Sequence, residues 1–151
     1  MGLDMDLVKV TSVSGQNRTG TCDIFIDGER VNVDMNKISC IEENVAYWRK
    51  ANGIHNWFVD NVQRGEDDYG KHDVSYGQMK RLLWSINATL SDPNNAGLYM
   101  PTSNFVTSAN DEYDDYYFKM LEYTKEVIEK CLEDKDSQYD WMSHYYYKSI
   151  T

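Results

Sequence analysis

Aromatic, basic and amide side chains are concentrated in one short run of this chain, from Tyr47 to Val62. That variety exceeds what a purely structural helix needs, so the run predicts a binding surface. The candidate ligand-binding residues in it are Trp48, Arg49, Lys50, Asn52, His55 and Trp57. No complete nucleophile motif, metal motif or phosphate-binding loop occurs in the chain, so we expect affinity for a ligand rather than turnover.

Charge is distributed unevenly along the chain. From Val45 to Leu90 there are six basic and five acidic residues, whereas from Asp111 to Asp140 there are eleven acidic and four basic residues. The basic residues of the middle segment are Arg49, Lys50, Arg64, Lys71, Lys80 and Arg81. Beside Trp57 and Tyr76 they would suit a nucleotide-like ligand, because cations bind phosphate and rings stack on a base. An ordinary charged surface is the alternative.

The acidic segment supplies a second group of candidates. Three tyrosines complete the ligand-binding set as a second wall, and they are Tyr113, Tyr116 and Tyr117. The carboxylates from Asp111 to Asp140 could instead bind a basic host protein through charge complementarity, as a mimic of nucleic acid, or form a solvated face.

Metal ions and other cofactors are not expected. The three histidines, His55, His72 and His144, lie far apart, and the chain has neither an H-E-x-x-H motif nor a C-x-x-C pair. The acidic triplet at residues 66–68 lacks the ligand spacing and the glycine of a calcium loop, so a solvated turn is the simpler interpretation.

His55 is the candidate general acid or base if the protein is an enzyme that acts on a nucleotide signal. Its place on the edge of an apolar helical arc also fits a buried histidine that makes a hydrogen bond inside the core. Catalysis needs a nucleophile beside a base, and one sequence does not give nearness in space. Binding without catalysis is therefore our leading expectation.

Composition narrows the class of protein. The chain has 151 residues and a formal charge of −10, which argues against direct binding to nucleic-acid phosphates. Cys22, Cys40 and Cys131 are widely spaced, as expected of reduced thiols in a cytoplasm. No apolar run approaches the roughly 18 residues of a membrane span, and the N-terminus lacks the features of a signal peptide.

The first third of the chain, residues 7–42, predicts strands. Asp27-Gly28 between two alternating runs is typical of a type I′ hairpin, and the turn sets Ile24 opposite Val31 on a buried side. Further strands are expected near residues 7–13 and 38–41, which gives an antiparallel meander. The aromatic tail at residues 139–150 predicts either a strand added to this sheet or a dimer contact.

Residues 44–135 predict mainly helices. The first is expected from Tyr47 to Val62, where Gly53 indicates either a close contact or mere tolerance. The second begins with a capping box at Ser75-x-x-Gln78 and runs to about Leu90. The third runs from Asn110 or Asp111 to about Asp134. We therefore expect a single α+β domain over residues 1–151, with an N-terminal antiparallel meander packed against about three helices.

One motif resembles a family of small proteins encoded by tailed phages and prophages. It reads Tyr47-Trp-Arg-Lys-Ala-Asn, then Ile54-His and Trp57-Phe-Val, followed by Asp67-Asp68. The similarity covers roughly residues 20–150 and includes the tyrosine cluster at 112–118 and the tail at 145–147. Members often have a cysteine after the Asp-Asp pair and an aromatic-glycine run before the tyrosine cluster. This chain has Tyr69 and the segment 103–106 at those places.

The resemblance implies a context rather than an activity. We expect a phage-encoded accessory protein in the cytoplasm of a bacterial host, where it would antagonise immunity without catalysis. It would either sequester a nucleotide-type signal or occlude a host defence protein, and a homo-oligomer or a place in the virion is compatible with the same residues.

Overall fold

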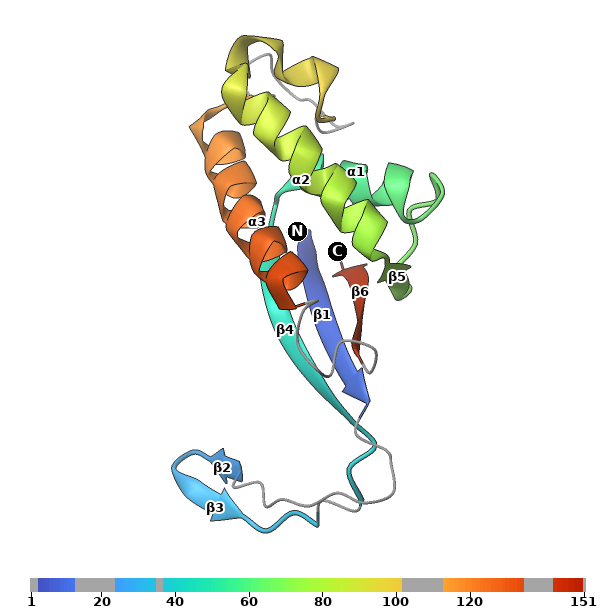
Figure 1. The fold of residues 1–151 in the computed structure, drawn as a ribbon, viewed down its shortest axis with the longest axis vertical. Coiled ribbons are helices and arrows are strands. Elements are labelled where there is room, and N and C mark those ends of the chain that lie inside the picture. Colours follow the sequence, from blue (N-terminus) through green and yellow to red (C-terminus); the bar gives the residue numbers. More distant parts are fainter. Residues whose placement is uncertain (1–2, 13–23, 35–36, 102–112, 135–142, 151) are drawn as a thin grey trace.

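The computed structural model describes residues 3–12, 24–34, 37–101, 113–134 and 143–150. In these residues the chain forms one α+β domain, which confirms the predicted fold class (Figure 1). None of the described helices is long and apolar enough to cross a membrane.

A four-stranded antiparallel sheet forms the centre of the fold. Its strands lie in the order β4-β1-β6-β5. Their bounds are Asp4–Ser12 for β1, Cys40–Arg49 for β4, His72–Val74 for β5 and Ser143–Ile150 for β6. Residues 143–150 of the aromatic tail therefore form a strand of the N-terminal sheet, one of the two interpretations that the sequence left open, and residues 139–142 lie outside the described residues. Strand β6 is an inner strand, paired with β1 on one side and β5 on the other.

Three α-helices gather at one end of this sheet (Figure 1). They are α1 at Asn52–Asn61, α2 at Tyr76–Ser91 and α3 at Asp115–Glu133, and a short 3-10 helix, η2, spans Pro93–Leu98. The capping box of α2 is confirmed, since the Ser75 side chain accepts from the Gln78 N–H and the Gln78 side chain accepts from the Ser75 N–H. Asp114 caps the N-terminus of α3, and its carboxylate accepts a hydrogen bond from the Tyr117 N–H.

The core lies between the helices and the sheet. Tyr147 of β6 stacks on Phe58 of α1, with ring centroids 4.0 Å apart and planes 5° from parallel. Both side chains are fully buried, as are Leu82 of α2 and Leu121 of α3. The large ring of Tyr147 therefore joins the inner strand to the helical layer.

The predicted meander is wrong in its connections. The hairpin has the expected register and turn, with Ile24 opposite Val31 and positive φ at Asp27 and Gly28. However, β2 (Ile24–Ile26) and β3 (Glu29–Val31) form a separate two-stranded sheet, which lies away from the helices (Figure 1). Strand β1 pairs with β4 and β6 instead. The hairpin's expected buried side is thus partly open, and Ile26 is 59% exposed.

The first predicted helix also begins too early. Residues 47–49 belong to β4, which is ten residues long, and helix α1 begins at Asn52. The apolar positions of this stretch fit the period of a strand as well as that of a helix. The structure follows the strand period, since Ala46 and Trp48 are buried while Tyr47 and Arg49 are exposed. In the pairing of β4 with β1, Trp48 lies opposite Met5 and Arg49 lies opposite Asp4. This pairing stabilises the strand over the predicted helix.

Candidate functional site

The aromatic run divides at Lys50 into two elements. Lys50 has φ of +56° and its N–H donates to the Leu3 carbonyl at 2.8 Å, so the chain turns there from β4 into α1. The side chains of Arg49, Lys50 and Asn52 are exposed at this corner. The Arg49 guanidinium lies 3.9 Å from the Asp4 carboxylate.

The two tryptophans of the run are core residues. Trp48 contacts Phe58 and Tyr123 at centroid distances of 5.9 and 6.3 Å, and its indole N–H donates to the Thr124 hydroxyl at 2.8 Å. Trp57 packs edge-on against Phe58 at 5.4 Å. With 1% and 3% of their surfaces exposed, these rings have no face open to a ligand.

The predicted tyrosine wall meets the run at two points. Tyr116 donates a hydrogen bond to the Arg49 carbonyl, and the Tyr117 ring packs on Gly53, where an added Cβ would lie 2.5 Å from ring carbon Cε2. Tyr113 and Tyr117 donate to the carbonyls of Met100 and Pro101 at 3.1 and 2.9 Å. Burial raises the pKa of Tyr117, so it remains a donor. The three tyrosines thus make hydrogen bonds and packing contacts within the fold, and the close packing of Tyr117 explains the glycine at position 53.

His55 is buried, and both of its ring nitrogens are engaged. Nδ1 lies 2.6 Å from the Tyr147 hydroxyl and Nε2 lies 3.0 Å from the Asp67 carboxylate. Burial raises the pKa of Tyr147, and Asp67 and Asp6 raise it further, so the phenol keeps its proton and can donate to Nδ1. With the phenol donating to Nδ1, Nε2–H donates to Asp67. This chain of bonds ties the loop after α1 to the core.

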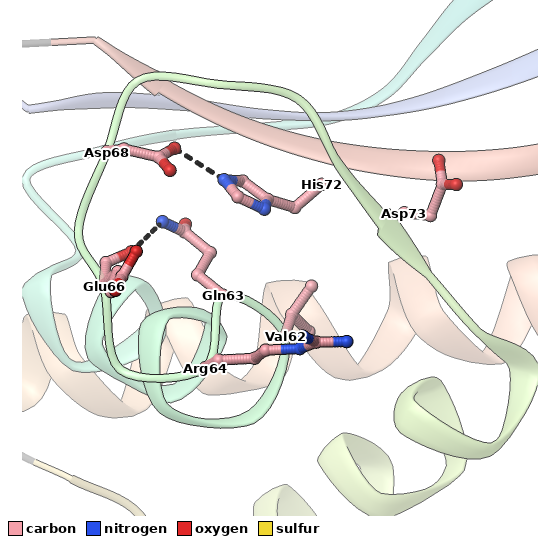
Figure 2. A pocket seen from close by; sticks show the side chains of 7 residues that line it. All are labelled: Val62, Gln63, Arg64, Glu66, Asp68, His72 and Asp73. Atoms are coloured by element: carbon pink, nitrogen blue, oxygen red, sulfur yellow. Dashed lines mark hydrogen bonds and ion pairs between the residues drawn. The ribbon is translucent and has the colours of Figure 1, made fainter.

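That loop encloses a hollow of about 450 Å³ (Figure 2). The lining residues are Val62, Gln63, Arg64, Glu66, Asp68, His72 and Asp73. Asp68 accepts hydrogen bonds from His72 Nε2 at 2.5 Å and from the Gly70 N–H at 2.8 Å, and these two bonds, the first more than the second, hold its pKa below the usual value. The acidic triplet is therefore more than a solvated turn, since consecutive aspartates bind histidines from α1 and β5.

The outward side of α2 carries an exposed aromatic residue, Trp84, which is not among the predicted site residues. Trp84 is 65% exposed and lies one turn after Lys80 and Arg81, which are also exposed. Its ring contacts Tyr99 edge-on at 6.0 Å, next to Leu98, which is 74% exposed. We call these five residues, Lys80, Arg81, Trp84, Leu98 and Tyr99, the α2 surface.

A signal in the sequence could have identified this surface. Met79, Leu82, Ile86 and Thr89 are the buried residues of α2, so Trp84 at a helical period of 3.6 points away from the core. The predicted basic patch is divided accordingly. The Lys80 ammonium lies 4.7 Å from the centre of the Tyr76 ring, the ring that was predicted beside the basic patch. The Lys71 ammonium lies instead over the Tyr146 ring, at 4.9 Å.

Metal binding has no support in the described part of the chain, where no group of three His, Cys, Asp or Glu side chains is placed to hold an ion. Among the same residues, no carboxylate lies within ion-pair distance of Lys80 or Arg81. Both cations are exposed, and Lys80 also lies against the Tyr76 ring.

Comparison of the chain with protein-family models, with curated proteins and with solved structures gives no match.

Proposed function

We propose that this chain is a phage-encoded accessory protein that antagonises bacterial immunity by binding a host defence protein without catalysis. The phage context rests on the resemblance carried by the motif from Tyr47 to Val59. The α2 surface carries the binding part of the proposal, because it exposes Trp84 and Leu98 beside Arg81 in an otherwise acidic protein.

The composition of the α2 surface suits a protein partner. Trp, Tyr and Arg are enriched among the residues that dominate binding energy in protein interfaces. An exposed tryptophan leaves a large apolar area in water, and covering it is favourable by about 25 cal/mol for each Å². Lys80 and Arg81 favour a partner that presents carboxylates around an apolar recess.

Sequestration of a nucleotide is less well supported by the geometry. Small ligands bind in concave sites that cover most of their surface. Trp48 and Trp57 are buried, so their rings cannot stack on a base. The hollow in the loop after α1 has three carboxylates against one guanidinium, which disfavours the binding of phosphate. A protein target is therefore the better of the two forms of the binding hypothesis.

An enzyme that uses His55 is a weaker alternative. The imidazole is 5% exposed, and Tyr147 and Asp67 occupy both of its nitrogens. Conversion of any cyclic or ADP-ribose-type nucleotide in a panel incubated with the protein would favour this alternative over ours. An acidic decoy based on α3 is also weaker, because Lys119, Lys125 and Lys130 are interspersed with its carboxylates.

Quantitative co-purification from a bacterial cytoplasm tests the proposal. Host proteins recovered with the wild-type chain are compared with those recovered with Arg81→Glu and with a control, Lys130→Glu, which makes the same charge change on an exposed position of α3. We expect at least one host protein to be lost at least tenfold with Arg81→Glu and retained with Lys130→Glu. Recovery that is equal for both variants would overturn the proposal.

A further inference from the structure

The loop from Val62 to Asp73 presents hydrogen-bond acceptors that outnumber the donors around its hollow. The lining includes the carboxylates of Glu66, Asp68 and Asp73, and one cation, Arg64. Figure 2 shows the Arg64 side chain directed away from Asp68, on the opposite side of the hollow. Carboxylates therefore outnumber the guanidinium in the lining of the hollow.

Gln63 gives a second and independent indication of a ligand. It is 4% exposed, its Nε2 donates to the Glu66 carbonyl at 2.9 Å, and its Oε1 accepts no hydrogen bond within the described residues. Figure 2 shows its amide end directed toward Asp68 and His72. A buried acceptor without a donor is costly, so a donor supplied by a ligand at this amide would stabilise it.

Asp68 adds a fixed anion to this site. Its Oδ1 is bonded by His72 and Gly70, which orients the carboxylate and leaves Oδ2 without a donor in the described part of the chain. The carboxylates of Glu66 and Asp73 are exposed at the edge of the hollow. The Gln63 amide and the Asp68 carboxylate thus lie at one space, and Glu66 and Asp73 add two exposed carboxylates to its lining.

We propose that this hollow binds a guanidinium group. Guanidinium is planar and has five N–H donors along its edges, so it can bond to several acceptors at once across a wide site. A metal ion does not fit, because the described residues place no three suitable ligands together. The group can belong to an arginine side chain of a protein or to a small guanidinium compound.

The hollow and the α2 surface share no residue, so this proposal does not depend on the proposed function. Backbone amide NMR during titration with N-acetyl-arginine methylamide tests it. The neutral isostere N-acetyl-citrulline methylamide is the control ligand. We expect saturable shifts at Gln63, Glu66, Asp68 and Gly70 with the arginine compound and at least tenfold weaker effects with the citrulline compound. Equal effects of the two ligands would overturn the proposal.

Matched variants distinguish binding of the arginine compound at the hollow from its general electrostatic attraction to an acidic protein. Glu66→Gln and Asp73→Asn each remove a charge from an exposed side chain at the hollow, and Glu126→Gln removes one from an exposed position of α3. We expect each hollow variant to weaken arginine binding about fivefold and Glu126→Gln to change it less than twofold. Equal weakening by all three variants contradicts a site at this hollow.

A third ligand, methylguanidinium, distinguishes the two sources of the group. Tighter binding of the arginine compound indicates that flanking peptide atoms contribute, as expected for a side chain of a protein. Equal binding of methylguanidinium indicates a small compound. Both results support the guanidinium site, whereas saturable binding of neither compound contradicts it.

Discussion

The aromatic run at residues 47–62 and the outward side of α2 contain the same kinds of residue and use them differently. Both combine tryptophan with adjacent lysine and arginine. In the run, Trp48 and Trp57 are buried, whereas Trp84 of α2 is 65% exposed. The comparison shows that composition identifies a candidate surface only after the buried side of each element is known.

The physical reason lies in how each segment is packed. Trp48 alternates with exposed neighbours on β4 and points at Phe58, and Trp57 packs on the same ring from α1. In α2, Leu82 and Ile86 already fill the side that faces the core. Trp84 is left mostly facing water, with an edge contact to Tyr99.

Trp48→Ala is the change from which we expect the largest effect on this comparison. It removes a buried ring and its hydrogen bond to Thr124, so we expect the free energy of unfolding to fall by about 3–5 kcal/mol. Trp84→Ala should change it by less than about 0.5 kcal/mol, because the ring is mostly in water. Chemical denaturation of both variants measures the contrast. Similar losses in the two variants would show that the assignment of core and surface is wrong.

His55→Ala should have the next largest effect. It leaves the buried Tyr147 hydroxyl and the Asp67 carboxylate without their partner, and an unpaired buried polar group costs about 1–3 kcal/mol. The companion variant His72→Ala affects a more exposed pair and should cost less than His55→Ala in the same denaturation experiment. The reverse order would mean that the loop after α1 is held mainly by Asp68.

Two glycine variants sharpen the comparison of α1 with α2. Gly53→Ala places a Cβ 2.8 Å from the Pro101 carbonyl as well as against Tyr117, so we expect a loss of about 1–3 kcal/mol. Gly77→Ala, in the first turn of α2, meets nothing nearer than the Ser75 hydroxyl at 4.0 Å and should stabilise the protein by about 0.4–1 kcal/mol. Thermal unfolding gives both signs, and a stabilising Gly53→Ala would contradict the packing of Tyr117 on α1.

Thiol labelling distinguishes buried from exposed positions without a change of sequence. Burial, more than the neighbouring groups, raises the pKa of Cys131 to about 11, whereas Cys40 is exposed on β4. At pH 8 we expect a thiol reagent to modify Cys40 readily and Cys131 only after denaturation. Peptide mass mapping locates the label, and rapid modification of Cys131 in the native protein would contradict its place in the core.

Much of the fold follows from local patterns in the sequence. The hairpin turn at Asp27-Gly28, the capping box at Ser75 and the amphipathic stripe of α3 each depend on neighbouring residues, and all three are present in the structure. The pairing of β1 with β4 and β6 depends on contacts between distant parts of the chain, which periodicity does not encode. The predicted start of the first helix at Tyr47 is wrong for the same reason, since residues 47–49 belong to β4.

The candidate site was less predictable than the fold. The choice of Trp48 and Trp57 as ligand-binding residues relied on residue type, and tertiary packing places both in the core. Trp84 could have been selected from the helical period of α2 alone. The joining of Asp67 to His55 and of Asp68 to His72 could not, because it depends on how the loop folds back over α1 and β5.

Binding measured on the α2 surface tests the central claim most directly. Once co-purification has identified the host protein, its dissociation constant is measured by calorimetry with Trp84→Ala and with Phe25→Ala, a control because Phe25 is 63% exposed on the hairpin. We predict that Trp84→Ala weakens binding by about 30-fold or more, as for a residue worth at least 2 kcal/mol at an interface, and that Phe25→Ala changes it less than threefold. Unchanged affinity with Trp84→Ala would contradict the account.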